Sequence, residues 1–193
     1  ITLGVAVPAS FTFAKTRFPG REGLRTAMIA TLIMPPVTFL VPSYVMMARL
    51  GLIDTTAPLV LLWAATATPG TIFLLSALMR SIPDEILEAA RIDGAGYFEV
   101  LLRIALPLSV PGLVTVMIFN ITTWWNDLLL PLVLIGDQDK TTLTVAAAAV
   151  GSRFSMDFPL VLTGLFLVSI PPILAYLVLQ RFIRRGLVAG AIK

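Results

Sequence analysis

The stretch LVLLWAATATPGTIFLLSAL, residues 59–78, contains no charged side chain. As a helix rising about 1.5 Å per residue it would extend about 30 Å, which is the thickness of the hydrocarbon core of a bilayer. Further apolar blocks lie on either side of it, at about residues 1–14, 26–48, 104–135 and 160–179. This pattern predicts an all-α fold, a polytopic bundle of transmembrane helices.

The composition supports a membrane protein and excludes several kinds of chemistry. Hydrophobic residues make up 58% of the chain and charged residues 13%, whereas about a quarter of a soluble domain is charged. Cysteine and histidine are absent, which excludes zinc sites, thiol nucleophiles and imidazole acid–base chemistry within this chain. The net charge of +3 comes from basic residues scattered through short loops, so we expect no nucleic-acid partner.

Two of the five blocks differ in length from a single straight crossing. The first block would rise only about 21 Å, so we interpret it as the end of a longer transmembrane helix and expect residues upstream of Ile1. The fourth block is too long for one crossing, and we expect it to bend or end at its prolines, Pro107, Pro111 and Pro131. The chain is therefore predicted to make five crossings, the first of them incomplete.

Basic residues divide unevenly between the two sides of such a chain. The loops at residues 15–25 and 80–103 and the tail from residue 181 hold eleven of them. The other side holds three, Arg49, Lys140 and Arg153. Because short cytoplasmic loops carry an excess of Lys and Arg, the first set of loops and the C-terminus are predicted to face the cytoplasm.

A charged segment, residues 81–107, separates the third and fourth apolar blocks. Ser81 can cap a helix, Pro83 suits a first helical turn, and the carboxylate of Asp84 favours the positive end of a helix dipole. We expect this helix to run to about Asp93.

The sequence Gly94-Ala95-Gly96 follows, and glycine readily adopts the left-handed conformation that ends helices. A second helix is predicted from Tyr97 to about Ala105, before Pro107. The charged segment is thus expected to form a helix–turn–helix along the membrane surface.

Two interpretations of the charged segment are open. It could rest on lipid headgroups as an amphipathic helix, but such helices are rich in Lys and Arg. Here five acidic residues stand against two arginines. Alternatively it docks a partner protein, since Ala89 and Ala90 permit close approach and Glu88 and Asp93 can pair with arginines. The charge balance favours docking.

The spacing Glu88-Ala89-Ala90, then three residues, Gly94, nine residues, Ile104, one residue, Leu106-Pro107 resembles the EAA loop of ABC-importer permease subunits. The stretches SIPDEILEAARIDGAG, WWNDLLLPLVL and RGLVAGAIK make the chain similar to the carbohydrate-uptake type, related to the smaller membrane subunit of the maltose importer. The resemblance covers nearly the whole chain.

The resemblance implies a type I importer fold, with a single permease domain over residues 1–193. Six crossings are usual in this subunit, so the first helix and part of the second would be missing here. The implied assembly lies in a bacterial-type inner membrane. It contains a second permease that is expected to be a paralogue, an ATPase dimer on the cytoplasmic side and an extracytoplasmic solute-binding protein.

In that family the EAA helix sits in a cleft of the ATPase. Carried onto this chain, the docking residues are Glu88, Ala89, Ala90, Asp93, Gly94, Ile104, Leu106 and Pro107, with residues 186–193 as secondary candidates. No phosphate-binding loop of the form Gly-x-x-x-x-Gly-Lys-Ser/Thr occurs in the chain. We therefore expect a non-catalytic subunit without a cofactor of its own, and ATP and Mg²⁺ in the partner ATPase.

Candidate residues for a substrate pathway lie late in the fourth block. Polar residues within a membrane are costly and usually face a bundle interior or water, and aromatic faces beside polar groups suit sugars. The candidates are Asn120, Thr123, Trp124, Trp125, Asn126 and Asp127. An interfacial tryptophan belt explains the two tryptophans equally well, and a helix–helix hydrogen bond explains Asn120. Beyond this, residues 142–152 are expected to form a short surface or re-entrant helix on the outer side.

Alternative functions differ in the sites they require. An importer of the same class for glycerol phosphate, a polyamine or an amino acid is the main alternative to a sugar importer. An ion-coupled secondary transporter needs intramembrane acids or sodium sites, for which Asp127 alone is thin support. An intramembrane protease of the Ser/His or metal type is excluded by the missing histidine.

Overall fold

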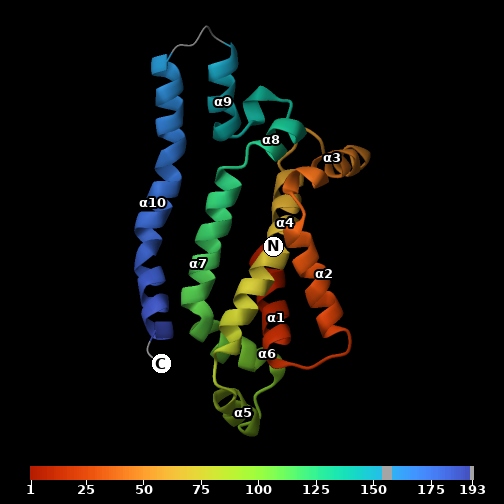
Figure 1. The fold of residues 1–193 in the computed structure, drawn as a ribbon, viewed down its shortest axis with the longest axis vertical. Helices are drawn as coiled ribbons and strands as arrows, with labels where there is room; N and C mark the ends of the chain where they lie inside the picture. The colour runs from red at the N-terminus through yellow and green to blue at the C-terminus, as the bar shows by residue number, and fades with distance from the viewer. Residues whose placement is uncertain (154–157, 192–193) are drawn as a thin grey trace. The chain divides into compact units, whose positions relative to one another are not determined.

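Helices make up all the regular secondary structure in the part of the chain that is described (Figure 1). The computed structural model describes residues 1–153 and 158–191, with side chains for all of these except 150–153, 179 and 181–191. The predicted all-α class is confirmed.

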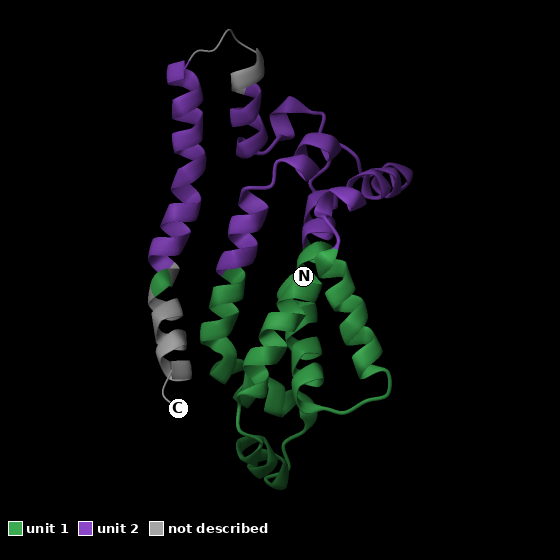
Figure 2. Ribbon diagram, in the orientation of Figure 1, with its two compact units in different colours: residues 1–33, 64–117, 179–193 green, residues 34–63, 118–178 purple. Residues whose placement is uncertain are grey.

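The chain forms two compact units, each built from segments far apart in the sequence (Figure 2). Unit 1 contains residues 1–33, 64–117 and 179–193, and unit 2 contains residues 34–63 and 118–178. Three long helices pass from one unit into the other: α4 (Ala57–Arg80), α7 (Leu106–Trp125) and α10 (Phe158–Ala191). The single permease domain over residues 1–193 stays a prediction.

Unit 1 is centred on the N-terminal helix and the helices around the charged segment. Its elements are α1 (Thr2–Lys15), α2 (Arg21–Ile33), most of α4 (Ala57–Arg80), α5 (Asp84–Ile92), α6 (Tyr97–Val100), a π-helical turn (Leu101–Ala105) and the first part of α7 (Leu106–Trp125). Phe11 of α1, Leu75 and Met79 of α4 and Val100 of α6 are buried together in its core. This core fixes both ends of the charged segment to the apolar helices.

Unit 2 holds the shorter connecting helices. Its elements are a 3₁₀ turn (Pro36–Phe39), α3 (Leu40–Arg49), the start of α4, the end of α7, α8 (Leu129–Leu134), a second 3₁₀ turn (Gln138–Lys140), α9 (Leu143–Arg153) and the first part of α10 (Phe158–Ala191). Met47, Leu59, Leu62, Leu134 and Ile135 form its buried core. The core joins α3 and α8 to the beginning of α4.

Three described helices are long and apolar enough to cross a membrane, over Ala57–Arg80, Tyr97–Trp125 and Phe158–Val178. The pair Arg21–Ile33 and Pro36–Arg49 would add a fourth span, broken next to Pro35-Pro36. Proline cannot donate the backbone hydrogen bond that would continue the helix there. The predicted count of five also included α1, whose 14 residues are fewer than the roughly 20 of a full crossing.

The fourth apolar block does not end at the prolines that were expected to end or bend it. Pro107 and Pro111 lie inside the continuous stretch Tyr97–Trp125, and α7 ends at Trp125. The helix breaks close to Asp127. Oδ1 of Asp127 accepts hydrogen bonds from Leu129 N at 3.1 Å and Leu130 N at 3.4 Å. This carboxylate caps a new helix, α8, and Pro131 lies within that helix rather than at a chain break.

The charged segment differs from its predicted form at both ends. Ser81 does not cap α5: its Oγ donates to Leu78 O at 2.7 Å and so satisfies a carbonyl at the end of α4. The capping position of α5 is occupied by Pro83 without a side-chain hydrogen bond. The second helix does not end before Pro107 but continues through the π-helical turn into α7. The π-helical turn ends two residues before Pro107, whose ring would meet the carbonyl four residues earlier in a regular α-helix.

Candidate functional site

One side chain of the first helix of the charged segment, α5, is fully buried in unit 1. Leu87 is 2% exposed, and it is the buried residue of α5. Glu88 and Ala89 lie on the exposed side, and Ala90 is half-buried. The helix thus presents an acidic and small-residue surface outward.

The turn after α5 depends on the backbone of Gly94. Its φ is +88°, in the left-handed region that suits glycine. The turn is closed by hydrogen bonds from Gly94 N to Arg91 O at 3.0 Å and from Ala95 N to Ala90 O at 2.9 Å. The predicted helix end at Asp93 and the predicted glycine turn are both found.

Two cavities, of about 330 Å³ and 360 Å³, are lined by residues of this helix and turn. The one beside the turn is lined by Ala90, Asp93, Gly94, Ala95, Glu99, Arg103 and Ile104, and Arg103 pairs with Glu99 within it. Four of the eight predicted docking residues therefore meet at one cavity. Glu88 lines the other cavity, whose further residues include Lys15, Arg17, Arg21, Asp84, Leu87 and Arg91.

The remaining predicted docking residues lie elsewhere. Leu106 is half-buried and packs against the core of unit 1, so its side chain is part of the scaffold. Pro107 is exposed on the first turn of α7. The side chains of residues 186–193 lie outside what the structure describes.

Exposed apolar side chains on the charged segment were missed by sequence reasoning. Ile92 is 86% exposed and Phe98 is 68% exposed, on either side of the glycine turn. Ile92 follows Leu87 by five residues, about 140° around the helix, which places it off the buried face. That offset was readable from the sequence, and large exposed apolar residues within a charged surface are typical of contact sites.

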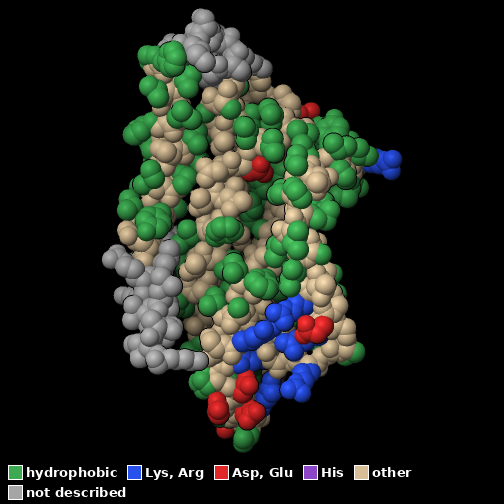
Figure 3. Space-filling model, in the orientation of Figure 1, with side chains coloured by type: hydrophobic (Ala, Val, Ile, Leu, Met, Phe, Trp, Pro, Cys, Tyr) green, Lys and Arg blue, Asp and Glu red, His purple; other side chains and the backbone are tan. Residues whose placement is uncertain are grey.

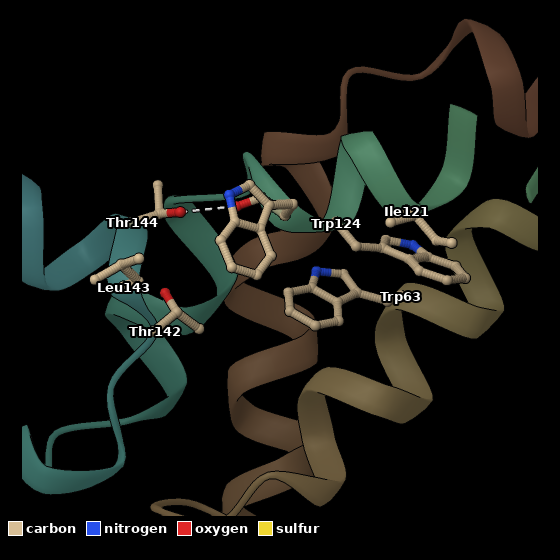
Figure 4. A pocket seen from close by; sticks show the side chains of 7 residues that line it. Trp63, Ile121, Trp124, Thr142, Leu143 and Thr144 are labelled. Carbon is tan, nitrogen blue, oxygen red and sulfur yellow. Dashed lines mark hydrogen bonds between the residues drawn. The ribbon is translucent and has the colours of Figure 1, made fainter. Parts of the chain in front are cut away.

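A second candidate site is an aromatic pocket of about 390 Å³ in unit 2 (Figure 4). It is lined by Trp63 of α4, Ile121, Trp124 and Trp125 of α7, and Thr142, Leu143 and Thr144 at the start of α9. These are all three tryptophans of the chain. The rings of Trp63 and Trp124 lie nearly parallel, with centroids 6.4 Å apart and planes at 19°.

Hydrogen bonds fix the orientation of two of these rings. Trp63 Nε1 donates to Asp127 Oδ2 at 2.6 Å, and Trp125 Nε1 donates to Val168 O at 2.9 Å. Thr144 Oγ1 donates to Trp125 O at 2.7 Å (Figure 4). The indole N–H groups of Trp63 and Trp125 are thus used within the protein, which leaves mainly carbon surface toward the pocket.

The predicted pathway residues do not all converge on this pocket. Trp124 and Trp125 line it, and Asp127 holds Trp63. Thr123 and Asn126 are exposed and bond back to their own helix, to Phe119 O and Thr122 O respectively. Asn120 is buried, at 7% exposure, and is not among the lining residues. Trp63 was missed because a tryptophan within an apolar block carries no spacing signal of its own.

Asp54 ties two loops of unit 2 together. It has a φ of +62°, and its Oδ1 accepts from Gly136 N at 2.6 Å and Asp137 N at 3.3 Å. A hydrogen bond from Lys140, together with one from Asp139 N, lowers the pKa of Asp137 below its ordinary value. The loop that leads into α9 is therefore a defined structure, and α9 itself confirms the helix expected near residues 142–152.

Residues 6–188 match the sequence profile of a family described as the binding-protein-dependent transport system inner membrane component. The chain belongs to this family. The assignment agrees with the spacing of residues 88–107 and confirms the resemblance to importer permease subunits.

Several curated proteins are similar to this permease-family chain. A diacetylchitobiose uptake system permease protein of Streptomyces coelicolor is 35% identical, over 95% of this chain and 62% of that protein. A melibiose/raffinose/stachyose import permease protein of Bacillus subtilis is 33% identical, over 96% and 67%. A trehalose transport system permease protein of Mycobacterium tuberculosis is 33% identical, over 100% and 71%. The chain thus spans about two thirds of the length of these relatives.

The fold is also similar to that of a solved transporter. A chain in the crystal structure of a bacterial ABC transporter involved in the import of the acidic polysaccharide alginate matches with a TM-score of 0.77 and 25% identity. The match covers 93% of this chain and 68% of that one. It confirms the importer-permease type of fold.

Proposed function

We propose that this chain is a transmembrane permease subunit of an ATP-driven, binding-protein-dependent importer that takes up a sugar or an oligosaccharide. The observation that carries the proposal is the charged segment: a docking-type helix and a glycine turn placed between apolar helices, with the residue spacing of an EAA loop. The relatives named for diacetylchitobiose, melibiose, raffinose, stachyose and trehalose support a carbohydrate as the solute.

The ATPase is proposed to grip the charged segment at α5 and the following turn. Glu88 and Asp93 offer carboxylates to arginines of the ATPase, and Ala89 and Gly94 allow close approach. Ile92 and Phe98 add exposed apolar surface that such a cleft would bury. Ile104, Ala90 and the Glu99–Arg103 pair complete the cavity beside the turn.

The chain is proposed to be non-catalytic, with ATP and Mg²⁺ bound by the partner ATPase dimer. No phosphate-binding loop is present in its sequence. A second permease subunit of related sequence and an extracytoplasmic solute-binding protein would complete the importer. The C-terminal residues 186–193 are proposed as a secondary contact with the ATPase.

The charged segment is proposed to face the cytoplasm. Lys15 pairs with Asp84, so the loop after α1 and the start of α5 lie at the same end of unit 1. Basic and acidic side chains gather at that end (Figure 3). This supports two crossings between residue 15 and residue 80, as the uneven distribution of Lys and Arg requires.

The aromatic pocket of unit 2 is proposed as a contact on the solute pathway. Its lining residues include no Lys, Arg, Asp or Glu, which favours a neutral solute over a glycerol phosphate or a polyamine. Indole faces suit the C–H faces of sugar rings, and the threonine hydroxyls of the pocket can hydrogen-bond to sugar hydroxyls. The carboxylate of Asp127 accepts hydrogen bonds from Trp63 and from the first turn of α8. This use weakens the case for an ion-coupled transporter with an ion site at Asp127.

Charge reversal at Glu88 tests the proposed docking. We expect Glu88→Lys to lower the amount of ATPase that co-purifies with the permease roughly tenfold, because a lysine would face the arginines that the carboxylate meets. The control is Glu22→Lys, an exposed charge reversal on α2 outside the charged segment. Membrane insertion should be unchanged in both. Solute uptake that persisted in cells lacking every ATPase partner would contradict the proposed function.

A further inference from the structure

The ammonium group of Lys15 has one acceptor for each of its three hydrogens. Its Nζ donates to Arg80 O at 3.4 Å, to Ile82 O at 2.5 Å and to Asp84 Oδ1 at 2.7 Å. Lys15 is the last residue of α1, Arg80 is the last of α4 and Asp84 is the first of α5. One side chain therefore joins the ends of three helices.

Burial makes this junction more than a surface ion pair. The side chain of Lys15 is 6% exposed, although that of Asp84 is 72% exposed. Two of the three acceptors are backbone carbonyls, and one of them, Arg80 O, lies at the negative end of α4. Lys15 thus binds the backbone between α4 and α5 as well as the carboxylate of Asp84.

The helix after the glycine turn, α6, is also attached to α1. The hydroxyl groups of Tyr97 and Thr12 share a hydrogen bond of 2.7 Å, and the ring of Tyr97 packs against Phe11 with centroids 5.2 Å apart. Thr12 and Lys15 are three residues apart, so they are neighbours on one side of α1. The segment is held to α1 just before α5 and again just after the glycine turn.

The part between these two attachments is held by few buried side chains. Leu87 is the fully buried residue of α5, and Ala90 and Ala95 are half-buried against the core of unit 1, whereas Gly94 is exposed. A force applied to α5 by a partner would therefore reach the apolar helices through Leu87, these two alanines and the two attachments to α1.

We propose that Lys15 and Tyr97 are positioning residues that make α1 follow the movement of α5, so that ATPase closure moves α1 together with α4 and α7. The proposal rests on the function proposed above and adds a transmission element to it. Neither residue belongs to the EAA spacing, and neither touches the cavity beside the turn.

The test compares transport with ATP hydrolysis in the complete importer reconstituted in liposomes. Lys15→Met keeps the length of the apolar stem and removes all three hydrogen bonds, and Tyr97→Phe keeps the ring and removes the hydroxyl that bonds to Thr12 and, at 3.5 Å, to Pro8 O. For Lys15→Met we expect normal recovery of the ATPase subunit, ATP hydrolysis within about twofold of wild type and at least roughly five-fold less solute transported per ATP. Arg25→Met, which removes an exposed cation 3.8 Å from Glu22, is the control and should keep the wild-type ratio.

A reversible link separates positioning from folding. The chain has no cysteine, so Lys15→Cys combined with Asp84→Cys can be joined by a short bis-methanethiosulfonate reagent that reductant releases. The linked importer should regain transport per ATP, and reductant should abolish the gain, while each single variant shows no such response. Wild-type coupling in Lys15→Met, or no recovery on linking, overturns the proposal. A wild-type complex that does not transport solute would instead refute the proposed importer function, on which this proposal rests.

Discussion

At the scale of single residues, Gly94 is required by the conformation of its own backbone and not by crowding within the chain. Gly94 has a φ of +88°, and a Cβ added to it would meet no atom within 4 Å. Gly96, two residues later, has a φ of −74° and an equally open surrounding. The two glycines therefore differ in backbone conformation but not in the space around them, so their substitutions can be compared directly.

Alanine substitutions at these glycines should have different effects. A left-handed conformation costs a non-glycine residue about 1–2 kcal/mol, so Gly94→Ala should weaken ATPase binding about five- to thirty-fold. Gly96→Ala should change it less than about twofold, because alanine adopts the observed conformation without strain. Titration of the solubilised permease with labelled ATPase measures both affinities. Equal losses at the two positions would show that space or side-chain contact, rather than backbone conformation, governs the turn.

Local sequence rules found the turn but not the caps. The two glycines and the acidic first turn of α5 were readable, because glycine conformation and helix dipoles act within a few residues. Ser81 and Asp127 were assigned other roles from the sequence. Each side chain can reach a backbone group on either side of it, and only the positions of α4 and α8 decide which one it satisfies.

At the scale of helices, apolar block length predicted most of the spans and failed where polar side chains or proline intervene. The blocks at residues 59–78 and 160–179 correspond to α4 and to the first part of α10. The block at 26–48 is broken beside Pro35-Pro36, and the block at 104–135 divides after Trp125. Hydropathy is averaged over many residues, so it does not locate the single positions at which these helices break.

The aromatic pocket is a product of helix pairing within unit 2. Trp63 on α4 and Trp124 on α7 are 61 positions apart in the chain, yet their rings lie nearly parallel. No local pattern marks Trp63, because pairing between distant helices is set by packing and not by spacing. The adjacent pair Trp124-Trp125 was noticeable from the sequence, whereas the third ring was not.

Removal of the third ring tests the solute contact. We expect Trp63→Ala to raise the sugar concentration needed for half-maximal uptake about tenfold, equivalent to about 1.4 kcal/mol of lost binding. Phe73→Ala, on the same helix and partly exposed outside the pocket, should leave this concentration unchanged. Uptake assays would use the sugars named for the relatives, with trehalose and melibiose first. An unchanged half-maximal concentration in Trp63→Ala, for whichever sugar the importer accepts, would remove the pocket from the pathway.

At the scale of the whole molecule, the separation of polar and apolar surface matches the proposed function. Unit 1 carries the charged segment and the basic loop after α1, and these meet at the Lys15–Asp84 junction. Unit 2 carries the aromatic pocket and the loops joined by Asp54. An importer subunit needs one region that receives mechanical work and another that contacts solute, and the chain provides a candidate for each.

The most direct test of the central claim is the reactivity of one cysteine placed at residue 92. Ile92→Cys puts a thiol at an exposed position at the end of α5, in a chain that has no other cysteine. A membrane-impermeant maleimide should label it in inside-out vesicles and not in right-side-out vesicles, and added ATPase should protect it. Labelling from the outer surface, or labelling in inside-out vesicles that bound ATPase does not reduce, would contradict a cytoplasmic docking segment.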